Sequence, residues 1–201
     1  MRAYYEQRAR EYDDWWLGAG LFAGRQRPGW GEEVAELVGV LSSLPGARTL
    51  DVACGTAFLT RHLRGEVTAL DQSAAMVAIA RELLPAAEVL HADALPLPFA
   101  DGAFERVVTG HFYGHLLEGQ REAFVADARR VGRELVVVDS ALRDDVEAEG
   151  WQERVLGDGS RHRVYKRYFT GAGLAEELGG HTLHDGQWFV VVAAPWAPSA
   201  G

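Results

Sequence analysis

The residues with the clearest chemical meaning lie in two segments that each end in an acid. Residues 50–57 read Leu-Asp-Val-Ala-Cys-Gly-Thr-Ala, so an apolar run ends in Asp51 and small residues follow. Small residues let a ligand approach the backbone, and a helix expected at 57–64 would present free N–H groups. Asp71 ends the next apolar run about twenty residues later, the usual spacing to an acid that accepts hydrogen bonds from a ribose. The pattern predicts a site for a ligand that contains a nucleoside.

The residues of the turn separate two classes of such ligands. A dinucleotide site needs Gly-x-Gly-x-x-Gly, so that a pyrophosphate can lie on the helix N-terminus. Here the positions are Asp51-x-Ala53-x-Gly55-x-Ala57, and Phe58 stands three residues after Gly55. A carboxylate at the strand end would repel a pyrophosphate, whereas it suits a ligand with a cationic end. A nicotinamide enzyme is therefore disfavoured, and the alternative without any ligand is an ordinary turn of a parallel sheet.

Four segments, in order along the chain, resemble the class I S-adenosylmethionine-dependent methyltransferases. In the first, alanine replaces two of the family's three glycines, although it lacks glycine's freedom at positive φ. The four are Asp51 to Ala57, Asp71-Gln-Ser-Ala-Ala-Met76, His91-Ala-Asp93-Ala94, and Leu95 to Val108 with Glu105 for the usual Asp. The resemblance implies S-adenosylmethionine as the cofactor and a reversed last strand in the sheet.

The resemblance also implies which residues meet the cofactor. Asp71 would bind the ribose hydroxyls, and Asp93 with Ala94 would meet the adenine ring. The full set of expected cofactor residues is Tyr5, Tyr12, Asp51, Ala53, Gly55, Thr56, Asp71, Gln72, Met76, Asp93, Ala94, Thr109 and His111.

Two histidines follow the fourth expected strand, where the transferable methyl group should lie. His111 or His115 is a candidate general base, because imidazole titrates near working pH. In the alternative, one histidine packs and the other only lines the pocket. An acidic acceptor oxygen would need no base, since methyl transfer is an in-line displacement helped by proximity and orientation. The pair lacks a third ligand at a recognisable spacing, so no metal site is expected.

A basic cluster lies in a segment that reads as a hairpin, residues 151–169, around Gly157-Asp-Gly-Ser160. Strand alternation puts Arg161, Arg163, Tyr165 and Arg167 on one face, with His162 and Lys166 on the other. One face is predicted to close as a lid over an anionic or strongly polar acceptor, because arginine binds phosphonate and carboxylate in bidentate fashion. The alternative is a solvated charged face.

Three segments resemble small-molecule O-methyltransferases of natural-product pathways, such as the phosphonate O-methyltransferase of the dehydrophos pathway. They are the opening Tyr5-x-x-Arg8-Ala9-x-Glu11-Tyr12-Asp13, the Gly-His-x-x-x-His segment of His111 and His115, and the hairpin Asp158-Gly…Arg163-x-x-Lys166. This resemblance implies substrate contacts from Arg163 and Lys166, with His115 on the same side. It implies cofactor contacts from the two tyrosines.

Strand and helix patterns alternate through most of the chain, which predicts a parallel, doubly wound sheet. Expected helices are 1–17, 32–44, 57–64, 73–84, 119–131 and 173–178; expected sheet strands are 48–53, 66–70, 87–91, 104–110, 134–139, 181–184 and 188–194. The fold class is thus α/β, a Rossmann-like, seven-stranded, mostly parallel sheet with an antiparallel last strand. One domain, 1–201, is expected, with a helical cap (1–44), a cofactor-binding core (45–140), a hairpin lid insertion (141–169) and a final helix and strand pair (170–195).

Composition limits the partners. The 201 residues carry a formal net charge of −9, which opposes binding to nucleic acid. The chain shows no signal-peptide core and no apolar run of the roughly 20 residues that span a bilayer, and its single cysteine cannot form an internal disulfide. A cytoplasmic enzyme with a small-molecule acceptor is predicted; a homodimer is one oligomeric state that the sequence allows.

Two rivals share the cofactor motifs. A quinone-type C-methyltransferase would need an apolar acceptor pocket, which the basic hairpin disfavours. A catalytically inactive, cofactor-binding regulatory protein would bind the cofactor without turnover.

Overall fold

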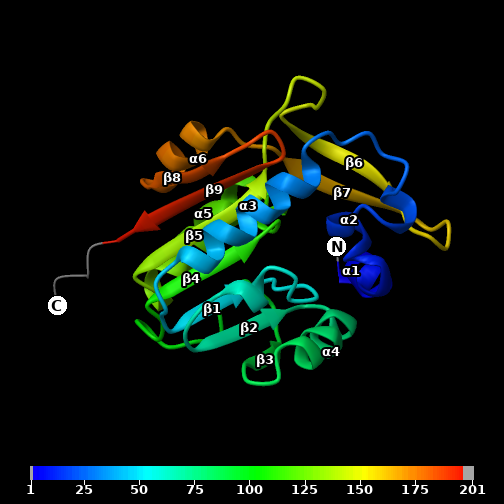
Figure 1. Ribbon diagram of the computed structural model, residues 1–201. Helices are drawn as coiled ribbons and strands as arrows, with labels where there is room; N and C mark the ends of the chain where they lie inside the picture. The colour runs from blue at the N-terminus through cyan, green and yellow to red at the C-terminus, as the bar shows by residue number, and fades with distance from the viewer. Residues whose placement is uncertain (1, 197–201) are drawn as a thin grey trace.

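A single seven-stranded sheet forms the centre of the computed structural model, which describes residues 2–196 (Figure 1). Its strands are β1 (Thr49–Val52), β2 (Val67–Asp71), β3 (Glu88–His91), β4 (Arg106–Gly110), β5 (Glu134–Ser140), β8 (His181–Asp185) and β9 (Phe189–Pro195). Their spatial order is β3-β2-β1-β4-β5-β9-β8. The first five are parallel, and β9 runs antiparallel to both β5 and β8. The predicted Rossmann-like sheet with a reversed last strand is confirmed.

Helices cover both faces of this sheet. The helices α3 (Trp30–Ser43) and α4 (Ala74–Leu83) pack on one face, and α5 (Glu118–Val131) and α6 (Gly171–Leu178) pack on the other. Central strands are therefore buried on both sides, which is why Leu135 to Val138 is a continuous apolar run with no exposed surface. Ser73 starts α4, where its Oγ accepts a hydrogen bond from the Met76 N–H at 3.2 Å.

The predictions of helices over 1–17 and 57–64 are wrong, because neither segment forms one continuous helix. Over 57–64 the chain forms a turn and only a short 3-10 helix (Thr60–His62). Ala57 has a φ of 69°, which a right-handed helix cannot include, and the extended Leu63, with a ψ of 146°, ends the short helix. Over 1–17 the helix is broken into α1 (Arg2–Arg8), a 3-10 turn (Ala9–Glu11) and α2 (Asp14–Leu17). Gly18, with a φ of 65°, ends the last of these pieces.

Residues 18–31 are rich in Gly and Pro, which predicts a loop, but this segment also contains regular structure. A 3-10 turn forms at Gly20–Phe22, and α3 already begins at Trp30. At the other end of the chain, the sequence predicts a loose tail from Pro195 onward. Instead, β9 extends through Pro195, because Pro195 still pairs with Glu134 of β5. The remainder of that expected tail, from 197 onward, lies outside the described residues.

The predicted hairpin is present as a separate two-stranded antiparallel sheet of β6 (Glu149–Val155) and β7 (Arg161–Arg167). Figure 1 shows it beside α1 and α2, away from the centre of the large sheet. A small apolar cluster of Tyr4, Leu156 and Val164 joins the N-terminal segment to the hairpin. The Gly157 N–H also donates to the Glu11 carboxylate at 3.1 and 3.2 Å. The cap and the hairpin thus support each other. None of the helices in residues 2–196 combines the length and apolar character needed to cross a membrane.

Candidate functional site

The two acids that the sequence singles out end neighbouring strands, because β1 and β2 pair in parallel. The Asp71 carboxylate accepts hydrogen bonds from the Gly55 N–H at 2.9 Å and the Ser73 N–H at 2.8 Å. One carboxylate therefore holds both the turn after β1 and the start of α4. Burial raises the pKa of Asp71, and the N–H groups of Ser73 and Gly55 oppose that shift.

The turn after β1 adopts the backbone conformation that glycine favours, although two of its residues are alanine. The φ angles are 60° at Ala53, 57° at Gly55 and 69° at Ala57. A left-handed conformation costs a residue with a Cβ about 1–2 kcal/mol. The surrounding contacts offset this cost, so the alanines leave the path of the turn intact and a ligand can still approach its backbone.

Asp51 is a buried carboxylate whose protonation is finely balanced. It is 3% exposed, and its Oδ2 accepts a hydrogen bond from the Thr60 hydroxyl at 2.6 Å. Burial raises the pKa of Asp51 to about 7; the charge of Asp71 adds to the shift, and the Thr60 hydrogen bond opposes it. Beside Asp51 lies a small cavity of about 20 Å³ that Cys54 also lines. A cation placed next to this carboxylate would stabilise its ionised form.

This balance predicts pH-dependent binding of a cationic ligand. Three factors set the pKa of Asp51: its burial, the hydrogen bond from the Thr60 hydroxyl, and the charge of the Asp71 carboxylate. Affinity for S-adenosylhomocysteine, which carries an α-ammonium group, should rise as the pH increases through about 7, by at most tenfold per pH unit below the pKa. Calorimetry between pH 5.5 and 8.5 measures this, and Asp51→Asn should flatten the profile. A flat profile in the unmodified protein would contradict the assignment.

The same pKa also affects stability. In the unfolded chain the Asp51 carboxyl ionises near its usual 3.8, whereas in the folded protein without ligand it keeps its proton to about pH 7. The unfolded state therefore loses its proton first, and this group lowers the free energy of unfolding progressively as the pH rises from about 4 to 7.

A cavity of about 400 Å³, here called the strand-end cavity, contains the residues expected around an adenine ring. Gln72, Asp93, Ala94, Leu95 and Phe112 line it. Its lining combines apolar side chains with polar ones such as Gln72 and Asp93, which is typical of a small-molecule site. Three other expected cofactor residues line none of the cavities described here. Met76 is fully buried, the Thr56 hydroxyl donates to Asp13 at 2.5 Å, and the Thr109 hydroxyl donates to the Val52 carbonyl at 2.8 Å.

The N-terminal helix is held against this side of the sheet by contacts that the sequence analysis missed. Glu6 accepts hydrogen bonds from the Ser73 hydroxyl at 2.7 Å and the Ala75 N–H at 3.1 Å. Arg2 donates to the Gln72 carbonyl and to Asp93, both at 3.1 Å. These partners are separated by 67 to 91 positions, so no local signal could pair them.

A second cavity, of about 240 Å³, lies between the N-terminal segment and the hairpin and is called the cap cavity. Tyr5, Tyr12, His111 and His115 line both the cap cavity and a small bridging cavity of about 30 Å³, which also touches Asp71. Burial raises the pKa of both tyrosines, so their phenols stay protonated. The structure thus brings the expected tyrosines and histidines together beside the strand ends.

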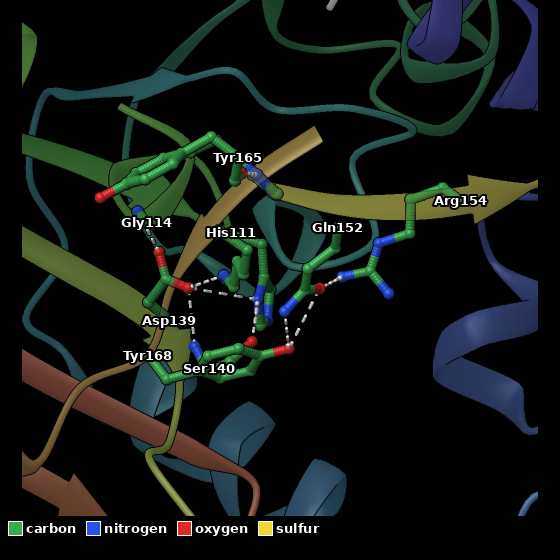
Figure 2. A network of polar contacts seen from close by, with 10 residues as sticks. His111, Gly114, Asp139, Ser140, Gln152, Arg154, Tyr165 and Tyr168 are labelled. Carbon is green, nitrogen blue, oxygen red and sulfur yellow. Dashed lines mark hydrogen bonds and ion pairs between the residues drawn. The ribbon is translucent and has the colours of Figure 1, made fainter. Parts of the chain in front are cut away.

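His111 is a packed histidine in a strained backbone conformation, with a φ of 54°. Its ring centroid lies 4.8 Å from that of Trp15 and 5.1 Å from that of Trp16. Its Nδ1 is 3.3 Å from the Ser140 hydroxyl and 3.8 Å from Asp139 Oδ1 (Figure 2). Burial lowers the pKa of His111 to about 3, although Asp139 opposes the shift, so the ring is neutral at physiological pH.

His115 has a better placed free nitrogen. Its Nδ1 lies 2.6 Å from the carbonyl oxygen of Tyr165, which can only accept, so Nδ1 carries the proton and Nε2 keeps a lone pair. The side chain lines the cap, bridging and strand-end cavities. Burial and the nearby Lys166 charge lower the pKa of His115 to about 3. At neutral pH the ring of His115 is therefore uncharged, and its Nε2 can accept a hydrogen bond but is a weak general base.

The two basic residues expected to bind an acceptor together project from opposite faces of the hairpin. Lys166 is 3% exposed and forms an ion pair with Asp139, whose carboxylate also accepts from the Gly114 and Ser140 N–H groups at 2.7 Å (Figure 2). Arg163 is exposed, and its guanidinium stacks over the Trp151 ring at 5.4 Å. Lys166 lines the cap cavity, whereas Arg163 lines none of these cavities.

Three arginines that the sequence analysis did not select line the cap cavity instead. Arg8 comes from α1, Arg25 from the loop before α3, and Arg154 from β6. Arg154 lies on the face of the hairpin that also carries Lys166, by strand alternation across the paired strands. These three cations come together for two reasons. Arg154 projects from the face of the hairpin that lines the cap cavity, and the N-terminal segment, which carries Arg8 and Arg25, packs beside that hairpin. Within residues 2–196, no group of three His, Cys, Asp or Glu side chains could hold a metal ion.

Comparisons with known proteins agree with this geometry. A family model described as a methyltransferase domain matches residues 50–135. A demethylmenaquinone methyltransferase from Bacillus cytotoxicus is 37% identical over 86 residues, which are 37% of this chain and 36% of that protein. The match thus spans little more than a third of that relative's length.

Two solved structures are similar over nearly the whole chain. A complex of DhpI with SAH has 26% sequence identity and a TM-score of 0.75, covering 98% of this chain and 95% of that one. A DhpI–SAM–HEP complex has 27% identity and a TM-score of 0.74, covering 95% and 94%. The motif match, the sheet order and this extended similarity confirm the expected resemblance to the class I S-adenosylmethionine-dependent methyltransferases: the methyltransferase-domain model matches residues 50–135, and the fold is shared over nearly the whole chain.

Proposed function

We propose that this protein transfers a methyl group from S-adenosylmethionine to an oxygen of a small anionic molecule bound in the cap cavity. One observation carries the choice of acceptor: the cap cavity of a protein with net charge −9 is lined by Arg8, Arg25 and Arg154. Guanidinium groups recognise carboxylates and phosphoryl or phosphonyl groups by paired, charge-assisted hydrogen bonds.

None of these three arginines has a carboxylate partner within 4.0 Å in the described part of the chain. Arg8 donates to the Tyr4 hydroxyl at 3.0 Å, and Arg154 donates to Gln152 Oε1 at 2.6 Å. Burial lowers the pKa of Arg25, and the charges of Arg154 and Arg8 lower it further, as expected for neighbouring like charges. An anion in the cavity would relieve this repulsion.

Two carboxylates also line the cap cavity, but both are engaged elsewhere. Glu11 accepts hydrogen bonds from the Gly157 N–H, and Glu153 forms an ion pair with Arg161. Of the two, only Glu153 is neutralised by a cation, so within the described residues three unpaired guanidinium groups face one unpaired carboxylate, Glu11. This distribution favours an anionic acceptor over a neutral one.

The cofactor side fits S-adenosylmethionine. The turn from Ala53 to Ala57 keeps the open backbone that a ligand needs, and Asp51 offers a carboxylate suited to the cofactor's α-ammonium group. Asp71 would hold the ribose, and Asp93 with Ala94 would line the adenine. Bound S-adenosylmethionine supplies an electrophilic methyl group on a cationic sulfur.

The chain's own contribution would then be mainly orientation. The arginines would fix the anion, and His115 Nε2 would accept a hydrogen bond from any hydroxyl on the acceptor, aligning an oxygen toward the bridging cavity. An ionised oxygen is already nucleophilic, so a group with the lowered pKa of His115 suffices. The resemblance of the opening, histidine and hairpin segments to a phosphonate O-methyltransferase supports transfer to oxygen.

Two rivals remain distinguishable. The first rival is a quinone-type C-methyltransferase, because the Bacillus relative is a demethylmenaquinone methyltransferase; that match, however, covers only 36% of the relative. The three arginines that line the cap cavity would also be a poor environment for an apolar quinone. A regulatory protein without turnover would bind the cofactor and methylate nothing.

The test is a methyl-transfer assay with labelled S-adenosylmethionine and a panel of small phosphonates, phosphate esters, carboxylates and quinones. We expect turnover with a member of the anionic classes. Replacing Arg154 by glutamine should raise the acceptor's KM about tenfold, the scale of one charge-assisted hydrogen bond, with little change in cofactor affinity. Arg10→Gln is the matched control, since Arg10 is an exposed arginine of the same N-terminal segment as Arg8 and lines none of these cavities. Cofactor binding with turnover only on quinones, or none at all, would contradict the proposal.

A further inference from the structure

We infer that the β6–β7 hairpin is also part of the cofactor site: Trp151 and Tyr165 cover the adenine from one face of the hairpin, while the opposite face contributes to the acceptor site. Binding of the cofactor would then fix the hairpin in the position that holds the acceptor. This inference rests on the proposed function, because it takes the strand-end cavity as the adenine site.

The two faces of the hairpin line two different cavities. Trp151 and Tyr165 are cross-strand partners whose rings lie 5.9 Å apart, and both line the strand-end cavity. Arg154, Val164 and Lys166 project from the other face and line the cap cavity. Near the turn, Glu153 and Val155 belong by alternation to the face of Trp151 but also line the cap cavity, so the two faces are divided between the cavities only at the end of the hairpin away from the turn. One thin element therefore separates two sites.

Trp151 is the feature that most needs an explanation. Trp151 is 56% exposed, although tryptophan is usually well buried. It lies beside a cavity whose other walls include Ala94, Leu95 and Leu116. An aromatic surface next to an apolar cavity is suited to stacking with a flat heteroaromatic ring, which would bury that surface. Arg163 stacks over the Trp151 ring at 5.4 Å and helps to hold it in place.

Polar contacts tie this hairpin to the residues between the two sites. His115 donates to the carbonyl oxygen of Tyr165 at 2.6 Å, and the next residue, Lys166, forms the buried ion pair with Asp139 at the end of β5. A shift of β7 would therefore move the backbone that orients His115 as well as the cations of the cap cavity. A ligand that holds Tyr165 on one side should improve binding on the other, and the coupling must be reciprocal.

The experiment measures two affinities in the full-length protein. Calorimetry gives the Kd of S-adenosylhomocysteine, and inorganic phosphate is the probe for the cap cavity, titrated with and without saturating S-adenosylhomocysteine. In the unmodified protein we expect S-adenosylhomocysteine to tighten phosphate binding at least fivefold. Trp151→Ala should weaken S-adenosylhomocysteine about tenfold and reduce the coupling toward one, and Trp151→Phe should restore most of both.

The controls separate this inference from the proposed function. Arg10→Ala, an exposed arginine of the N-terminal segment that lines none of these cavities, should change neither affinity. If the unmodified protein fails to bind S-adenosylhomocysteine, the proposed function itself fails. If it binds normally and a folded Trp151→Ala variant keeps the same affinity and the same coupling, only the role of the hairpin in the cofactor site is overturned.

Discussion

Replacing Lys166 by methionine is expected to lower the free energy of unfolding by about 3–5 kcal/mol at pH 7, the usual effect of removing one partner from a buried ion pair. Lys166 is 3% exposed, and its partner Asp139 is completely buried. Without the ammonium group, the carboxylate keeps only the N–H groups of Gly114 and Ser140 as close partners, beside His111. Urea or thermal unfolding of the two proteins, followed by circular dichroism, measures the difference.

The pH dependence gives this prediction a definite sign. Burial alone would raise the pKa of Asp139, but the charge and hydrogen bond of Lys166, with His111, lower it below the usual 3.8. In the unmodified protein this carboxylate therefore contributes stability above about pH 4, which is lost as the pH falls through the lowered value. In Lys166→Met the buried carboxylate should take up a proton more easily, so the deficit should shrink toward low pH.

A double variant provides the control. Lys166→Met with Asp139→Asn removes both charges and should recover much of the lost stability, because neither an ammonium nor a carboxylate is then left unpaired. Equal stability of Lys166→Met and the unmodified protein at pH 7 would show that the ion pair contributes nothing. The result would also count against the hairpin being anchored at β5.

Replacing Asp71 by alanine is expected to weaken S-adenosylmethionine binding about 10- to 100-fold, the scale of hydrogen bonds to a charged group. Asp71 supports the site in two ways. It lines the bridging cavity, and it holds the turn after β1 through the Gly55 N–H and the start of α4 through the Ser73 N–H. The variant therefore loses a ribose ligand together with the support of the neighbouring backbone. Calorimetry with S-adenosylmethionine and S-adenosylhomocysteine measures the loss.

Asp71→Asn is the matched control for shape. The amide keeps one acceptor oxygen but introduces an N–H₂ group where the carboxylate accepts backbone N–H bonds, so it should not restore full affinity. Circular dichroism and the unfolding midpoint must show that both variants are folded. A folded Asp71→Ala protein with unchanged affinity for both compounds would remove Asp71 from the cofactor site.

The core of the fold was predictable because its signals are local. Apolar runs such as Leu135 to Val138 identify strands that are buried on both faces, and Ser73 marks the start of α4. Local signals were less reliable where tertiary contacts hold a strained backbone. Ala57 adopts a positive φ and interrupts the helix expected at 57–64, a conformation that alanine does not favour by itself.

The candidate site divides in the same way. Asp51, Asp71, Asp93 and Ala94 were identifiable because parallel strands bring their carboxyl ends to one edge of the sheet. The arginines of the proposed acceptor site could not be identified from the sequence, because the segments that carry them meet only after folding. Arg8, Arg25 and Arg154 carry no shared motif, and they converge because the N-terminal segment folds against the hairpin.

The sequence by itself therefore determined the family resemblance, the sheet and the edge at which we propose that the cofactor binds, since these motifs are short and continuous. Only the tertiary structure decided which cations line the cap cavity. Strand alternation separates Arg163 from Lys166, and burial then pairs Lys166 with Asp139, since an ammonium group that leaves water needs a compensating charge. The cations that remain available to a ligand are Arg8, Arg25 and Arg154, which folding brings to the cap cavity without a carboxylate partner among the described residues.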